Sequence, residues 1–265
     1  MLRTITALAL GACLTVAGSD FEWSLPKGFP RPQAPASNPM TAAKVELGWY
    51  LFYDKRLSAN GTQSCASCHK QELAFTDGLP RAKGSTGEFH PRSSMSLVNV
   101  AYATHLTWAN PELDSLEQQA LTPMFGVEPV ELGLRGHERE LLERLSGDPV
   151  YRRLFPRVFR DTQSVYTIDN VTKAIAAFER TIVSVRSPYD RYRWGGDLTA
   201  ISGSAKRGEV IFESSERGRC FQCHSGWNFL GRPVRGAEGQ SDGWRRPRVL
   251  HDRCDVVFGA ESRDL

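Results

Sequence analysis

Two short stretches of the sequence carry the same pattern of two cysteines followed by a histidine. The first is "CASCH" at residues 65–69 and the second is "CFQCH" at residues 220–224. In a helical turn, residues three apart lie on the same side, so both sulfur atoms of each motif can face one partner. This spacing is typical of c-type haem attachment, in which the thiols add to the two vinyl groups and the histidine binds the iron.

Three other uses of paired cysteines fit the sequence less well. A thioredoxin-like redox pair needs a βαβ setting, which is missing, and structural disulfides would not require a histidine in both motifs. A four-cysteine zinc ribbon has its pairs about 15–20 residues apart, whereas most of the chain separates these two pairs. We therefore predict two covalently bound haem c groups. Haem 1 would be held by Cys65, Cys68 and the axial ligand His69, and haem 2 by Cys220, Cys223 and the axial ligand His224.

The composition indicates a globular protein of one large or two ordinary domains. The chain has 265 residues, of which 40% are hydrophobic and 24% are charged, with a net charge of +3. These values are typical of a folded, soluble protein. Lysine and arginine do not gather in a dense stripe, so nucleic acid is not an expected partner.

The first 18 residues are predicted to form a signal peptide. Arg3 precedes the apolar run "ITALALGACLTVA", which is too short to span a bilayer. Within this run, "LGAC" resembles a bacterial lipoprotein box, and Cys13 would then become a lipid-anchored N-terminus. The alternative is an ordinary cleavage near residues 17–19. Both interpretations predict a periplasmic protein.

The rest of the chain favours helices joined by long loops. Residues 19–37 form a proline-rich linker or surface strap, and Asn38 is the expected cap of the next helix, with Pro39 in its first turn. Further helices are expected from Asp114, over "GHERELLERLSGD" up to Gly147, and over "SAKRGEVIFESS". The clearest helix follows Thr167, where apolar residues recur at helical spacing.

No run of alternating strands interrupts these helical segments, and residues 73–96 read as a long loop. We predict a mainly α fold with two cytochrome c-like helical domains. The first would cover residues 38–165 and haem 1. The second would begin at residues 166–229 with haem 2 and be incomplete, since residues 230–265 form an atypical tail.

Several longer stretches resemble one known family. They are "NPMTAAKVELGWYLFYDKRLSANGTQSCASCHKQELAFTDG", "MSLVNVAYATHLTWANPELDSLEQQALTPMFGVEPVELG", "AIAAFERTIVSVRSPYDRYRWGGD" and "KRGEVIFES" with "CFQCHSGWNF". In this order they resemble the bacterial di-haem cytochrome c peroxidase/MauG superfamily, and most of all its members associated with methanobactin-type copper systems. The resemblance runs from Pro39 to Phe229.

The resemblance implies that haem 1 reacts with hydrogen peroxide. Glu131 in "PVELG" matches the family's acid in the peroxide pocket, and Gln119 in "LEQQAL" matches a glutamine of the same pocket. Such a carboxylate can carry a proton from one peroxide oxygen to the other. Glu128 is the neighbouring alternative, and without the resemblance Glu131 would be taken for an ordinary loop carboxylate.

Three further residues acquire roles only through the resemblance. Trp108 in "LTWANP" matches a tryptophan between the two haems that carries an electron, although a lone tryptophan is otherwise a packing residue. Asn99 matches one ligand of a calcium ion between the domains. His90 is the candidate for a removable sixth ligand of haem 1, in a loop whose length departs from the family pattern.

The tail departs from the family. Members place the sixth ligand of haem 2 there, a methionine in peroxidases or a tyrosine in MauG, but no methionine follows Met124 and no tyrosine follows Tyr192. We expect a truncated or frameshifted C-terminus. The alternative is a divergent tail in which His251 or Cys254 binds the iron.

The predicted function is peroxide-dependent oxidation. Electrons would come from a small redox protein, either a cytochrome c or a cupredoxin, or from side chains of a partner protein. Two alternatives stay open at this point, a passive di-haem electron carrier and an inactive gene remnant.

Overall fold

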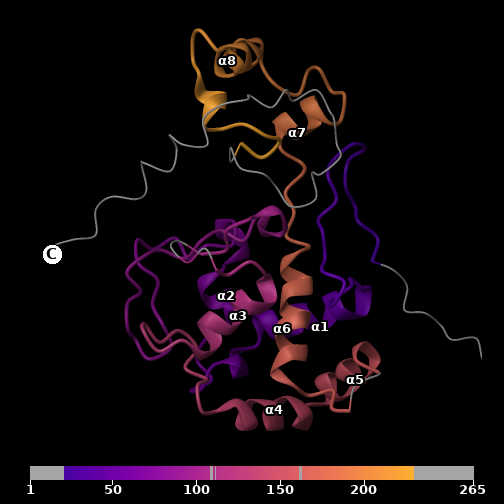
Figure 1. The fold of residues 1–265 in the computed structure, drawn as a ribbon, viewed down its shortest axis with the longest axis vertical. Coiled ribbons are helices and arrows are strands. Elements are labelled where there is room, and N and C mark those ends of the chain that lie inside the picture. Colours follow the sequence, from indigo (N-terminus) through magenta and orange to yellow (C-terminus); the bar gives the residue numbers. More distant parts are fainter. Residues whose placement is uncertain (1–20, 108–109, 111, 161–162, 230–265) are drawn as a thin grey trace, which may run out of the picture.

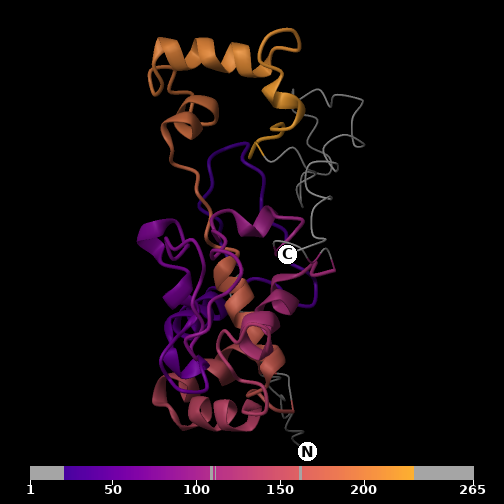
Figure 2. The same cartoon turned by 90° about the vertical axis from the view of Figure 1, so that its left-hand side faces the viewer.

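The computed structural model describes residues 21–107, 110, 112–160 and 163–229. Figures 1 and 2 show a larger part that holds α1 to α6 and a smaller part that holds α7 and α8, joined by an extended segment. The described residues contain helices and isolated bridges but no strand, which confirms the predicted mainly α fold. None of the described helices is long and apolar enough to cross a membrane. The α-helices are α1 (Ala42–Tyr53), α2 (Cys65–Cys68), α3 (Leu116–Phe125), α4 (Glu138–Gly147), α5 (Pro149–Val158), α6 (Ile168–Glu179), α7 (Pro188–Arg193) and α8 (Gly203–Glu213).

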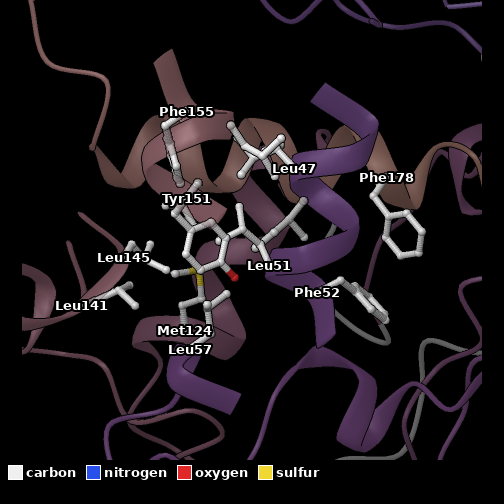
Figure 3. Close-up of a cluster of buried hydrophobic side chains, with 14 of the residues drawn as sticks. Leu47, Leu51, Phe52, Leu57, Met124, Leu141, Leu145, Tyr151, Phe155 and Phe178 are labelled. Carbon is white, nitrogen blue, oxygen red and sulfur yellow. The ribbon is translucent and has the colours of Figure 1, made fainter. Parts of the chain in front are cut away.

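The centre of the larger part is the pair of helices α1 and α6, against which α3 and α5 pack. Figure 3 shows the apolar side chains between them, with Leu47 and Leu51 of α1 facing Tyr151 and Phe155 of α5. Gly48 permits the close approach of α1 to α6, because a Cβ atom there would meet the carbonyl oxygen of Ala174 at 1.9 Å. The helix that carries the first motif, α2, packs against α1 of this core.

The predicted caps are partly confirmed. Thr167 caps α6, since its hydroxyl accepts a hydrogen bond from the amide of Asn170 at 3.1 Å. Asn38 does not cap α1, which begins after Thr41, and the helix expected from Asp114 is capped by Ser115 instead. Both errors are shifts of one to three residues in segments where several capping residues stand close together.

Asn38 instead belongs to a buried polar network between α1, α3 and α6. Its amide donates to Glu117 at 2.6 Å, and its oxygen accepts from Lys44 at 2.7 Å. Glu117 also receives two hydrogen bonds of 2.8 Å from the guanidinium of Arg180. Burial, the largest single influence, raises the pKa of Glu117, but the hydrogen bonds and charge of Arg180 and the hydrogen bonds from Asn38 and the backbone together outweigh it, so the pKa lies below its usual value. The network pairs each of these buried polar groups, which lets the three helices pack closely.

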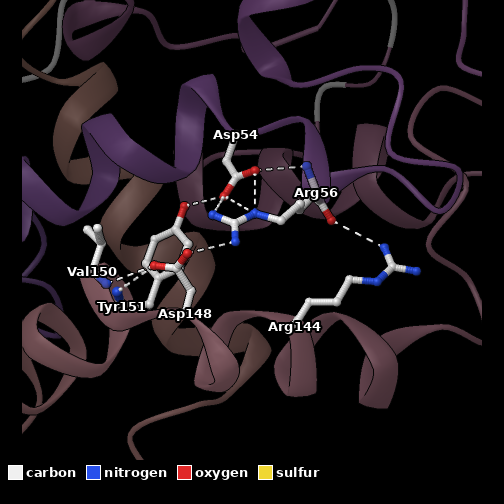
Figure 4. A network of polar contacts seen from close by, with 6 residues as sticks. All are labelled: Asp54, Arg56, Arg144, Asp148, Val150 and Tyr151. Carbon is white, nitrogen blue, oxygen red and sulfur yellow. Dashed lines mark hydrogen bonds and ion pairs between the residues drawn. The ribbon is translucent and has the colours of Figure 1, made fainter.

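A second network fixes the turn between α1 and the first motif (Figure 4). Asp54 accepts from the side chain of Arg56 at 2.9 Å and from the hydroxyl of Tyr151 at 2.7 Å. Arg56 also donates to Asp148 at the start of α5, at 2.9 Å. The turn that leads into the first motif is therefore tied to the α4–α5 corner.

The proline-rich strap lies between the larger and the smaller part. Phe29 is buried, and its ring packs edge-on against Tyr102, Trp194 and Trp227. The hydroxyl of Tyr102 donates to the carbonyl of Pro30 at 2.7 Å. The boundary between two domains at residues 165 and 166 stays a prediction, and α6, on its far side, packs in the larger part.

Candidate haem sites

The first motif forms a short helix whose two thiols and histidine are held in a defined arrangement. The cysteines begin and end α2, and the amide of Ser64 just before it donates to the hydroxyl of Ser67 at 3.0 Å. His69 follows as the C-terminal cap. Its Nδ1 lies 2.9 Å from the carbonyl oxygen of Phe75 and must donate to it, which leaves Nε2 as the nitrogen available to a metal.

A cavity opens beside this helix and is called the haem 1 cavity below. It is partly open to solvent. Apolar side chains such as Leu97, Met124 and Ile175 form much of its wall. The polar or reactive residues that line it include Cys65, Cys68, His69, Gln119, Glu131 and Glu179. Residues from α2, α3, α6 and the loop after α3 therefore meet at one place.

Burial sets the protonation of the groups in this cavity. It raises the pKa of the Cys65 and Cys68 thiols, so both are neutral before they react. It lowers the pKa of His69, against the opposite influence of the Phe75 and Met95 carbonyls, which favours the neutral imidazole that binds metals. Burial likewise raises the pKa of Glu131. A carboxylate with a raised pKa accepts a proton more readily than an exposed one.

The loop that carries Glu131 is held in place by the segment around residue 85. The amide of Ser85 donates to the carbonyl of Glu131 at 2.7 Å, and the amide of Val130 donates to Glu88 at 3.1 Å. Gly84 is needed for this contact, because a Cβ atom there would lie 1.9 Å from the carbonyl oxygen of Val130. The alternative acid, Glu128, is exposed and does not line the cavity.

His90 lies in the same segment and approaches Glu131. Its Nε2 is 3.6 Å from Oε1 of Glu131, and burial lowers its pKa. The backbone around it forms a small hairpin, in which the amide of His90 donates to the carbonyl of Ala82 at 2.7 Å. His90 is not among the residues that line the haem 1 cavity. The structure therefore brings this histidine to the edge of the site, beside the predicted acid.

The second motif resembles the first in how its histidine is held. Residues Cys220–Gln222 form a 3-10 turn, and Nδ1 of His224 lies 3.2 Å from the carbonyl oxygen of Phe229. Both phenylalanine acceptors, Phe75 and Phe229, adopt a left-handed backbone with φ of 58°. Cys220 and Cys223 are both exposed.

The other predicted positions give a mixed result. Trp108 lies outside the described residues, as do Cys13, His251 and Cys254. Oδ1 of Asn99 accepts a hydrogen bond from the amide of Ser184 at 2.9 Å, so a calcium ion would have to share this oxygen. The calcium site stays a prediction.

The described side chains do not support a shared zinc site or a disulfide. Within the described ranges, no three histidine, cysteine or acidic side chains gather as ligands of one metal ion. Cys65, Cys68, Cys220 and Cys223 form no disulfide with one another. The haem 1 cavity suits a porphyrin better than a zinc ion or a disulfide, since it combines apolar walls, two thiols on one helix and a neutral histidine.

One functional candidate in the cavity was missed by sequence reasoning. Glu179 falls on the apolar stripe of α6, four residues after Ile175 and three before Ile182. A charged residue on a stripe that faces the core is unusual. This position was the signal that could have identified it.

Comparison with known proteins agrees with this geometry. The sequence profile described as "Di-haem cytochrome c peroxidase" matches residues 42–198. The methylamine utilization protein MauG of Methylorubrum extorquens is 37% identical over 84% of this chain and 60% of its own. The cytochrome c551 peroxidase of Nitrosomonas europaea is 32% identical over 84% of this chain and 64% of its own.

A solved structure also shares the fold of this chain. It is a MauG-like protein associated with microbial copper homeostasis, with a TM-score of 0.77 and 39% identity over 83% of this chain and 62% of that chain. The chain thus spans about three fifths of the length of the relatives that it matches. With its two haem-attachment motifs and the profile match over more than half of its residues, this chain belongs to the di-haem cytochrome c peroxidase family.

Proposed function

We propose that this protein is a di-haem oxidoreductase that uses hydrogen peroxide at the haem 1 cavity. The observation that carries the proposal is that two thiols, a neutral histidine, Gln119 and Glu131 line one cavity. The reaction adds two electrons and two protons to hydrogen peroxide and releases two molecules of water. A haem iron held by Cys65, Cys68 and His69 would supply the redox chemistry that cleaves the oxygen–oxygen bond.

The residues of the cavity would bind peroxide and move its protons. Glu131 takes a proton from one peroxide oxygen and returns it to the other, which then leaves as water. The raised pKa of Glu131 supports this role, because burial makes its carboxylate a stronger acceptor of a proton than an exposed one. The amide of Gln119 donates a hydrogen bond that orients the peroxide.

His90 is proposed to control access to this site. Its contact with Glu131 places it where movement of the hairpin would change both the acid and the approach to the iron. A histidine that binds the iron would keep peroxide out, and its departure would admit it. Because only a neutral imidazole binds a metal, the binding and departure of His90 would depend on its protonation state.

The second motif is proposed to hold haem 2, which would pass electrons toward the first site with the help of Trp108. The electrons come from a small redox protein or from side chains of a partner protein. The predicted signal peptide would direct the protein to the periplasm, where c-type haems are attached, and a calcium ion at Asn99 would brace the junction between the two domains.

The decisive experiment compares Glu131→Gln with Glu128→Gln in the haem-loaded protein. Loss of the acid–base group should slow the peroxide-induced change of the haem spectrum by about 100- to 10,000-fold. The Glu128→Gln variant should react like the wild type, because Glu128 is exposed and outside the cavity.

A passive electron carrier gives a different result. Both haems would then be indifferent to peroxide, and neither substitution would matter. Steady-state assays with peroxide and reduced cytochrome c distinguish the two electron sources, since a protein that modifies a partner would consume little cytochrome c.

A further inference from the structure

Glu179 is an acidic side chain in the haem 1 cavity to which the proposed peroxide chemistry gives no role. It is the last residue of α6 and lines the cavity together with Ile175, one turn earlier. Only 5% of its surface is exposed, and its Oε2 has no hydrogen-bond partner among the described residues. An unpartnered buried oxygen is costly, so it indicates a role that involves whatever fills the cavity.

The neighbouring cations do not neutralise Glu179. Arg180 is adjacent in sequence, but its guanidinium makes both of its short bonds to Glu117. The ammonium of Lys44 donates to Asn38 and to the carbonyl of Pro39. The network between α1, α3 and α6 therefore uses its positive charges internally and leaves the acid in the cavity without a partner of its own.

The electrostatic environment of Glu179 follows from these contacts. Burial is the main influence and raises the pKa of Glu179 to about 8, while the charge of Arg180 lowers it and that of Glu117 raises it. The titratable groups that share the cavity or face it from packed elements are Cys65, Cys68, His69, Glu131, Glu117, Arg180 and Lys44. Once the thiols are bound as thioethers, Glu131 is the other carboxyl group in the cavity that can exchange a proton.

We propose that Glu179 takes up one proton when the haem bound in this cavity takes up one electron. When a small redox protein supplied that electron, the carboxylate of Glu179 would gain a proton from solvent, so the net charge of the cavity would stay the same. Two charges in a poorly solvated cavity interact strongly, so a site that keeps its charge constant is favoured. This inference rests on the proposed haem 1 but not on the proposed reaction with peroxide.

The direction of the effect follows from the charges. The oxidised iron carries one more positive charge and stabilises the carboxylate, so the pKa of Glu179 is lower with oxidised than with reduced haem. Between these two pKa values, reduction requires a proton. The midpoint potential of haem 1 must then fall as pH rises through this interval.

The test is a redox titration of the haem-loaded protein, followed by optical spectroscopy in the absence of peroxide, from acidic to alkaline pH. In the wild type the haem 1 potential should fall with rising pH across the interval between the two pKa values of Glu179, the one with oxidised and the one with reduced haem. Glu179→Gln should remove most of this slope, since the amide cannot titrate. Glu72→Gln, an exposed glutamate in the turn after the motif, should keep it.

Two outcomes would overturn the proposal. One is a wild-type potential that does not depend on pH in this interval, which needs no variant to be decisive. The other is a slope that survives Glu179→Gln and disappears in Glu131→Gln, because the proton would then go to the other acid of the cavity.

A second measurement tests the proposal on the wild type, in case the Glu179→Gln variant does not bind haem. Infrared difference spectra of the wild type, reduced minus oxidised, should gain the band of a protonated carboxylic acid, and Glu179→Asp should shift it. Absence of this band in the wild type contradicts the proposal. A pH-dependent potential in a protein that ignores peroxide would refute the proposed function and leave this inference standing.

Discussion

The two C-x-x-C-H motifs hold their histidines in the same way but have very different surroundings. In both, the histidine is anchored through Nδ1 to the carbonyl of a phenylalanine with a left-handed backbone. The first motif lies beside a cavity walled by α3, α6 and the Glu131 loop. At the second, both thiols are exposed, and α8, the helix before it, buries no residue among the described part of the chain.

The difference separates what a motif provides from what a fold provides. The turn and the orientation of the histidine arise within about ten residues of the cysteines, so they form at both places. A cavity needs helices from distant parts of the sequence, and these surround only the first motif within the described residues. The chemistry of each site should therefore depend on the surroundings more than on the motif.

The largest effect should come from removing the attachment cysteines. Cys65→Ser/Cys68→Ser and Cys220→Ser/Cys223→Ser should each lose one covalent haem, seen as a mass loss and a lower pyridine haemochrome signal. The first change should also lower the Tm strongly, because it empties a cavity with apolar walls. Equal losses of Tm in the two variants would remove the contrast between the sites.

The packing of the two parts can be compared with one kind of substitution. Leu154 in α5 is fully buried, whereas Leu198 before α8 is 67% exposed. Leu154→Ala should lower the free energy of unfolding by about 2–5 kcal/mol. Leu198→Ala should change it by less than about 0.5 kcal/mol. Denaturant titrations measure both, and a large loss at Leu198 would indicate that the smaller part buries more than the described contacts suggest.

Sensitivity to acid should belong to the larger part, since the buried charged side chains of the described residues all lie at or before Arg180. The pKa of Glu117 is lower in the folded protein than in the unfolded chain, so its contribution is complete above the unfolded pKa. This contribution to stability is lost as pH falls through the pKa that Glu117 has in the folded protein. Glu117→Gln should cost about 1.5–3 kcal/mol at neutral pH and less in acid, as Tm measured against pH would show. An unchanged acid profile would contradict this assignment.

The smallest effect should come from helix caps. Thr167 caps α6 and Ser202 caps α8, each by accepting an amide hydrogen bond at 3.1 Å. Thr167→Ala should reduce global stability by about 1 kcal/mol. Ser202→Ala should leave the Tm of the larger part unchanged and only speed hydrogen exchange in α8. Exchange that rises equally throughout the protein in both variants would show that the two parts unfold together.

The sequence was sufficient for features that depend on neighbouring residues. The mainly α fold, the cap at Thr167 and the family followed from local patterns and motif order. Contacts over long separations did not, and Asn38 is the clearest case. Its partners Glu117 and Lys173 lie 79 and 135 residues away, and no local pattern distinguishes such a residue from a helix cap.

In the site too, some features follow from neighbouring residues and others depend on contacts over long separations. The cysteines and histidines follow from spacing, while Gln119 and Glu131 needed the resemblance to be selected from many similar residues. The structure brings both to the cavity that His69 lines. Glu179 escaped because a single acid on an apolar stripe reveals its significance only when the cavity beside it is known.

The packing of Phe29 has a consequence for how the chain is made. Its ring rests on Tyr102, Trp194 and Trp227, the last of which is synthesised almost two hundred residues later. The contact between Phe29 and Trp227 can therefore form only after residue 227 has been synthesised, whereas the contact with Tyr102 can form earlier. Full burial of the Phe29 ring thus depends on residues from both parts of the molecule.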